Sequence, residues 1–156
     1  MHFLFFIASV TTVFILSINP ALSADTKTVN NTGFIGLNTT PTARHDKINT
    51  IRIGTSNLDP YLHAYIGLQI ANPLYVNIRQ TAEISNINKK AKALYPGVDL
   101  KLRILRETRT QPEVSIGAQS AFGHKRMAGE FLALSKRYND FDFTAGIGWG
   151  RFATAK

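Results

Sequence analysis

The sequence predicts an all-β fold, an antiparallel meander of about seven strands. Three observations support this: apolar and polar residues alternate with a period of two, short turn-forming stretches separate the alternating runs, and no stretch after Ile48 has a long helical pattern. The alternation is clearest in Glu130–Phe152. There, apolar residues at odd positions from Phe141 to Trp149 alternate with small or polar residues at even positions, after an Asn139-Asp140 turn.

Residues 1–24 are predicted to be a secretory signal peptide, and residues 25–47 an extended polar lead-in. The uncharged apolar run Phe3–Ile18 leads to small residues, so cleavage is expected after Ser23 or Ala24. This run is shorter than the ~20 residues that a membrane-spanning helix needs. No Lys or Arg precedes it, which leaves an uncleaved anchor as the alternative. The lead-in is rich in turn-forming residues, and we expect it not to form a packed element.

Residues 48–152 are predicted to form the β-meander as one domain, a partial barrel. A polar stretch at 83–95 is the one long break and is expected to be a loop. The alternating sets that define the strands are Ile51–Ile53, Leu62–Ile70, Leu74–Ile78, Val98–Ile104, Val114–Phe122, Phe131–Tyr138 and Phe141–Trp149.

Composition and spacing give no sign of catalysis. The sequence has no cysteine, which excludes disulfides, thiolate metal sites and a lipid anchor on a cysteine of this chain. His45, His63 and His124 lie on different segments without metal-ligand spacing. Ser135 and Lys136 are adjacent on a strand and point to opposite faces, so they cannot act as a nucleophile pair. We therefore expect a protein that is not an enzyme, with no cofactor and no metal.

The net charge of +8 suits an anionic partner, such as phosphate-bearing lipid or an acidic polysaccharide. The charges are spread along the chain instead of clustered, which favours an ordinary solvated surface. Nucleic acid is not predicted as a partner.

Two architectures explain the alternation, and they place the apolar faces differently. In a soluble sandwich, two sheets pack these faces together. In an outer-membrane β-barrel, the apolar face meets lipid and the polar face lines the interior. Strands of about nine to eleven residues, aromatic residues near strand ends, and a second face rich in Gly, Ser, Gln and Arg favour the barrel. We expect an outer-membrane location. A soluble periplasmic β-sandwich that binds an anionic ligand is the alternative.

Three stretches carry a resemblance to a known family: Gly33–Arg44 (GFIGLNTTPTAR), the basic strand Asp99–Arg103, and Ser135–Arg151 (SKRYNDFDFTAGIGWGR). They resemble the amino-terminal part of the YjbH family, outer-membrane β-barrel proteins associated with exopolysaccharide production and export. The resemblance implies outer-membrane lipid around the protein, and an acidic polysaccharide and other export-system proteins as partners. Family members are several times longer, so we expect the chain to be a truncated piece.

Under the barrel prediction, five basic residues are candidates to line an interior that attracts an acidic polymer. They are Arg52, Arg79, Lys101, Arg103 and Arg137. Seven strands leave two unpaired sheet edges, which a bilayer does not tolerate because their backbone groups stay unsatisfied. The segment Val29–Leu37 could add a strand, or another chain could pair with the edge. Otherwise we expect assembly to fail.

Overall fold

The computed structural model describes residues 27–84 and 91–153. The predicted signal peptide lies outside the described residues. The elements in chain order are β1 (Gly36–Leu37), β2 (Thr40–Pro41), β3 (Ile51–Leu58), β4 (Tyr61–Ala71), β5 (Leu74–Ile84), β6 (Ala91–Leu105), β7 (Glu113–Gly123), the 3-10 helix η1 (Lys125–Met127), β8 (Gly129–Tyr138) and β9 (Phe141–Gly150).

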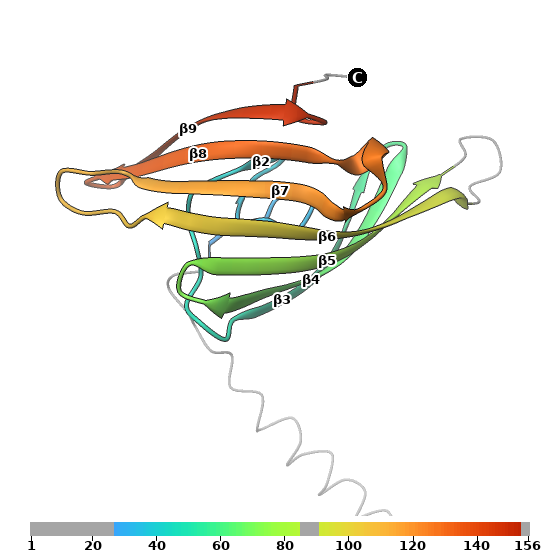
Figure 1. Cartoon of the computed structure of the whole chain (residues 1–156), viewed down its shortest axis with the longest axis horizontal. Helices are drawn as coiled ribbons and strands as arrows, with labels where there is room; N and C mark the ends of the chain where they lie inside the picture. The colour runs from blue at the N-terminus through green and yellow to red at the C-terminus, as the bar shows by residue number, and fades with distance from the viewer. Residues whose placement is uncertain (1–26, 85–90, 154–156) are drawn as a thin grey trace, which may run out of the picture.

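Strands β3 to β9 form one seven-stranded antiparallel sheet in which each strand pairs with its neighbour in the sequence. The sheet curls into a half-barrel (Figure 1). The all-β meander is therefore confirmed. The prediction of a loop over 83–95 is wrong at both ends, because β5 extends to Ile84 and β6 begins at Ala91. Cross-strand pairs such as Thr81 with Tyr95 extend this ladder beyond the stretch where alternation was visible.

The two faces of the sheet differ in polarity, as the period of two predicts. Side chains that point away from the curl are mostly apolar and are exposed or half-buried. One row crosses four strands through the paired residues Ile53, Ile66, Ile78 and Val98. Side chains that point into the curl are mostly polar and buried. They include His63, Gln69, Asn77, Arg79, Thr81, Asp99, Lys101, Glu113, Ser115, Gln119 and Ser135.

The segment Thr28–Asp46, here called the plug, lies across the concave face and fills much of it (Figure 1). It carries the short β1–β2 hairpin and an isolated bridge between Val29 and Ile35. Phe34 is fully buried and packs edge-on against Phe131 at 5.3 Å between ring centroids. The prediction that the lead-in is not a packed element is therefore wrong. The segment 29–37 also adds no strand to the large sheet. Its backbone groups instead form hydrogen bonds within the plug and with side chains of the sheet.

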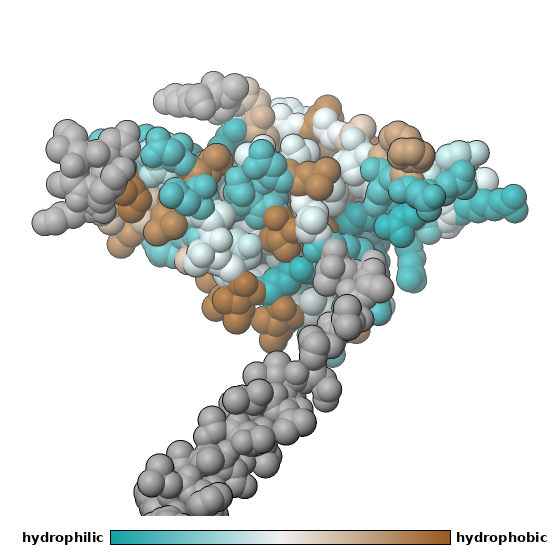
Figure 2. Space-filling view, turned by 180° about the vertical axis from the view of Figure 1, so that it is seen from behind, coloured by the Kyte–Doolittle hydropathy of each residue, from teal (hydrophilic) through white to brown (hydrophobic). Residues whose placement is uncertain are grey.

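The alternative sandwich architecture is also wrong. A sandwich buries the apolar faces of two sheets against each other, whereas the apolar face of this sheet is exposed and its polar face is covered. Seen from behind, hydrophilic groups occupy much of the surface, with hydrophobic groups between them (Figure 2). Within the described ranges, no helix has the length and apolar character needed to cross a membrane.

Candidate functional site

The concave face is built to hold the first half of the plug through its backbone. The hydroxyl of Tyr75 donates to the Gly33 carbonyl at 2.5 Å, and the side-chain amide of Asn77 donates to the Thr32 carbonyl at 2.9 Å. An irregular segment buried inside a protein must satisfy its backbone groups. The inward polar side chains of the strands provide those partners, which explains why this face is polar yet buried.

The second half of the plug is held in the same way from β6, β7 and β8. The ammonium group of Lys101 donates to the Arg44 carbonyl at 2.6 Å and to the Thr42 carbonyl at 3.3 Å. The hydroxyl of Ser115 donates to the Ala43 carbonyl at 2.8 Å, and the Ala43 N–H donates to the hydroxyl of Ser135 at 3.0 Å. Three neighbouring strands therefore fix three consecutive plug residues.

A buried ion pair lies under the plug on β5 and β6. The Arg79 guanidinium donates to the Asp99 carboxylate at 3.0 and 3.1 Å, and both side chains are fully buried. Asp99 also accepts hydrogen bonds from the Asn77 amide at 2.8 Å and from the Ser120 N–H at 2.7 Å. Because Ser120 sits in a β-bulge at φ 48°, its N–H turns toward this carboxylate. The charges of Arg79 and Asp99 are therefore balanced by each other and by hydrogen bonds from neighbouring groups of the protein.

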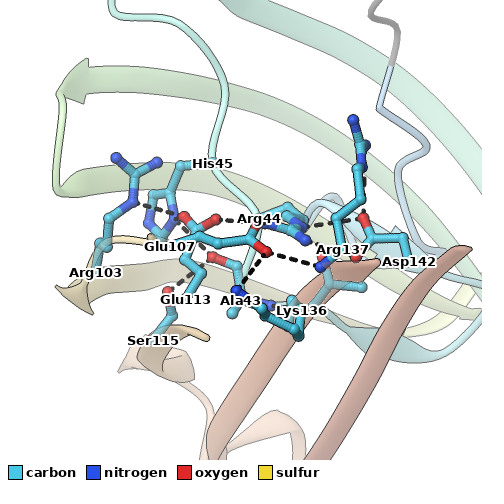
Figure 3. A network of polar contacts seen from close by, with 12 residues as sticks. Ala43, Arg44, His45, Arg103, Glu107, Glu113, Ser115, Lys136, Arg137 and Asp142 are labelled. Atoms are coloured by element: carbon cyan, nitrogen blue, oxygen red, sulfur yellow. Dashed lines mark hydrogen bonds and ion pairs between the residues drawn. The ribbon is translucent and has the colours of Figure 1, made fainter. Parts of the chain in front are cut away.

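One end of the half-barrel carries a denser ionic cluster around Arg44 of the plug (Figure 3). Its guanidinium contacts three carboxylates: Glu113 at 3.0 Å, Asp142 at 2.6 Å, and Glu107 in the closest contact. Burial alone would lower the pKa of Arg44, but the hydrogen bonds to Asp142, Glu107 and Glu113 raise it, so the group stays charged. One plug arginine thereby joins the β6–β7 loop, β7 and β9.

His45 follows Arg44 and is buried beside the same cluster. Its Nδ1–H donates to the Ala43 carbonyl at 2.9 Å, so Nε2 carries no proton in the neutral ring, and within residues 27–84 and 91–153 this nitrogen has no hydrogen-bond partner. Burial lowers the pKa of His45, and the charges of Lys101 and Arg103 lower it further. Glu113, 3.6 Å from Nδ1, and the Ala43 carbonyl oppose the shift. The ring is therefore neutral at neutral pH.

We expect acidification to weaken the fold through His45. Its folded pKa lies below its unfolded value of about 6.5, so its contribution is fully present above that pH and is lost as the pH falls through the folded pKa. The slope is at most about 1.4 kcal/mol per pH unit. Urea unfolding at several pH values between about 7.5 and 5 measures this dependence of the free energy of unfolding on pH. His45→Gln should reduce the slope and the exposed control His124→Gln should not. An unchanged slope in His45→Gln would contradict this assignment.

The structure places the five predicted interior basic residues in different settings. Arg79 and Lys101 are 1% and 0% exposed, the first paired with Asp99 and the second bonded to the plug, so neither faces an open interior. Arg103 pairs with Glu113 at 2.6 Å, Arg52 pairs with Asp46 at 2.5 Å, and the exposed Arg137 lies 3.7 Å from Asp142. The five have different partners, two of which are shared with Arg44, and they do not form one basic patch. That they attract an acidic polymer stays a prediction.

The alternation of the sequence placed Asp99 on the same face as the basic residues of its strand but gave it no role. Glu113 was not singled out, although the alternation of β7 could have placed it on the same face as Ser115. The role of Arg44 had no local signal, because its partners lie 63 to 98 positions away. Among the described residues, no group of His, Asp and Glu is arranged to hold a metal ion.

The comparison with known families identifies this plugged half-barrel. A family model described as "YjbH: Exopolysaccharide biosynthesis protein YbjH" matches residues 28–156. The chain belongs to the YjbH family. The YjbH match begins at the first plug residue and continues through all seven strands, so plug and sheet lie within one family unit. The description of the family refers to exopolysaccharide biosynthesis.

A curated YjbH relative supports the same assignment. Over 134 residues, covering 79% of this chain, the sequence is 31% identical to "Uncharacterized lipoprotein YjbH" of Escherichia coli (strain K12). The chain spans only 19% of the length of that relative. No solved structure matches the chain.

Proposed function

We propose that this chain forms part of the wall of an outer-membrane β-barrel that acts in exopolysaccharide export. The observation that carries the proposal is the inverted polarity of the sheet. Large apolar side chains such as Ile53 and Ile78 are exposed on its convex face, while charged Arg79 and Asp99 are buried on its concave face. A convex apolar face suits contact with lipid, and a polar concave face suits the inside of a barrel.

The length of the strands, the exposed aromatic residues and the description of the Escherichia coli relative support the same proposal. Strands β4, β5 and β7 have 11 residues each, within the range that tilted strands use to cross a bilayer. Aromatic side chains, including Tyr138, Phe141 and Phe122, are exposed near strand ends, as in the interfacial girdles of membrane barrels. The Escherichia coli relative is described as a lipoprotein, which fits a location in the cell envelope.

Under this proposal the chain has no enzymatic activity of its own. It would work with outer-membrane lipid around it, an acidic polysaccharide as cargo and further proteins of the export system. The plug would close this part of the interior, since it occupies the concave face through bonds from Tyr75, Lys101 and Ser115.

Fractionation of cells that express the tagged chain tests the proposal. We expect the chain in the outer membrane, resistant to extraction with alkaline carbonate and with a gel mobility that changes on heating. Carbonate extraction separates an embedded protein from one that adheres to the surface. Recovery in the soluble periplasm, or release by carbonate in a folded state, would contradict the membrane location.

A further inference from the structure

A cavity of about 560 Å³ lies between the β1–β2 turn and the inner face of β8 and β9. Two inward positions of β9, Gly146 and Gly148, line it, and Phe152 packs against Gly148. The β1–β2 turn of the plug contributes Thr39 and Thr40, both exposed, to the opposite wall. One wall thus carries two threonines, and the other combines glycine backbone with aromatic side chains.

A buried polar side chain on the cavity wall lacks a partner. Gln119 of β7 is 2% exposed, and its Nε2 group has no hydrogen-bond partner among the described residues. A buried donor without a hydrogen-bond partner destabilises the folded protein. Gln69, which is equally buried on the same face, is bonded: its Nε2 donates to the Ala71 carbonyl at 2.7 Å and its Oε1 accepts from the Asp46 N–H at 3.2 Å. Of these two buried glutamines, only the one beside the cavity has an amide nitrogen without a partner among the described residues.

The cavity also has a cation without an anion. Arg151 lines it, and its guanidinium lies 4.8 Å from the ring centroid of Tyr61 and contacts the sulfur of Met127. Across residues 27–84 and 91–153, no carboxylate forms an ion pair with Arg151. Arg44, Arg52, Arg79 and Arg103 all have such a partner. A carboxylate on a ligand would supply the missing anion.

Aromatic rings complete the lining. Phe152 folds back toward the inner face, where its ring comes close to Gly129 and Gly148, and it meets Phe131 edge-on at 5.5 Å between centroids. A sugar ring has an apolar C–H face and a hydroxyl edge. An aromatic wall, hydroxyl groups and an amide donor match both sides of such a ring, and pockets of this size combine apolar walls with a few placed polar groups.

We propose that this cavity binds a saccharide unit that carries a carboxylate, such as one uronic acid residue of an acidic glycan. Gln119 donates to a ring oxygen or hydroxyl, Arg151 faces the carboxylate, and Phe152 contacts the apolar face of the sugar. The inference rests on the proposed role in exopolysaccharide handling and names the class of sugar that the interior would recognise.

Binding of trigalacturonic acid to the purified full chain in detergent micelles tests the inference, with maltotriose as the uncharged comparison. Isothermal titration calorimetry should give saturable binding of trigalacturonic acid and at least tenfold weaker binding of maltotriose. Arg151→Gln should remove this preference. Gln119→Leu should weaken binding at least tenfold without lowering the melting temperature, because the substitution removes a donor that has no partner in the empty protein.

Gln69→Leu is the matched control. It removes a bonded glutamine outside the cavity, so it should lower the melting temperature and leave binding by the folded protein unchanged. The inference would be overturned by folded wild-type chain that binds neither saccharide, or by equal binding of both. Gln119→Leu that loses stability but keeps binding would also overturn it. Membrane fractionation needs no saccharide, so a chain that reaches the outer membrane without binding trigalacturonic acid would keep the proposed function and reject this site.

Discussion

Replacing Asp99 with alanine is expected to lower the free energy of unfolding by about 3–5 kcal/mol, because it leaves a buried charge without its partner. The Asp99 carboxylate accepts hydrogen bonds from the Arg79 guanidinium, the Asn77 amide and the Ser120 N–H, all buried on the concave face. Urea unfolding of the full chain measures the loss. The fluorescence of Trp149, the one tryptophan in the sequence, reports on the transition.

Two variants separate the ion pair from a general loss of negative charge. Asp140→Ala removes a carboxylate from the exposed β8–β9 turn and should change stability by no more than about 0.5 kcal/mol. The double variant Arg79→Met with Asp99→Leu should be more stable than Asp99→Ala, because no charge is left buried alone. If Asp99→Ala lowered the free energy of unfolding no more than Asp140→Ala does, the Asp99 carboxylate would have to be solvated in the folded protein, contrary to its full burial.

The sequence was most informative where the fold depends on local periodicity. In β9, residues 142 to 150 at even positions point inward and Phe141 to Trp149 at odd positions point outward, as the alternation predicted. The order of the strands also followed, since the sequence shows turns at Asn57–Pro60, Asn72-Pro73 and Asn139-Asp140. Strand ends were missed at Ile84 and Ala91, where pairing with a neighbour extends the ladder through residues that do not alternate.

The plug could not be predicted because its burial depends on partners far along the chain. The Ala43 N–H bonds to Ser135 across 92 positions, and the Ala43 carbonyl accepts from Ser115 across 72. Nothing in a turn-rich polar stretch signals such contacts. The large separation along the chain also explains why the partners of the interior basic residues were not predicted. Alternation placed Lys101 on the inner face, but only the structure shows that the carbonyl of Arg44, 57 positions away, accepts its hydrogen bond.

The candidate cavity is marked by a hydrogen bond that the Gln119 amide nitrogen does not make within the described part of the chain. The periodicity of the sequence does not indicate whether a buried polar group has a partner. The sequence shows Gln119 on the polar face and Gly148 on β9, which is consistent with any inward position. Gln69 donates to the carbonyl of Ala71 at the end of its own strand, whereas the amide nitrogen of Gln119 has no partner among the described residues, although both side chains are buried. A pattern of residue types predicts the polarity of a face but not whether each polar atom on it is satisfied.

Ile78→Arg is expected to lower the stability of the chain in a bilayer by about 2–4 kcal/mol. Ile78 lies near the middle of β5 and is 62% exposed on the convex face, between Ile66 and Val98 in the cross-strand row. If that face meets lipid, the guanidinium enters the hydrocarbon region. If it meets water, an exposed substitution of this kind changes stability by no more than about 0.5 kcal/mol. Urea unfolding of the chain in lipid vesicles measures the difference.

Leu105→Arg provides the control, because Leu105 is also exposed but lies at the end of β6. A position near the membrane surface should lose only about 0–1 kcal/mol, so the two arginine variants should differ by at least about 1 kcal/mol. A soluble protein has no such depth dependence, because both sites would be hydrated equally. Equal stabilities of Ile78→Arg and Leu105→Arg, both close to that of the wild type, would mean that the convex face contacts water. The apolar row across β3 to β6 would then need a protein partner in place of lipid.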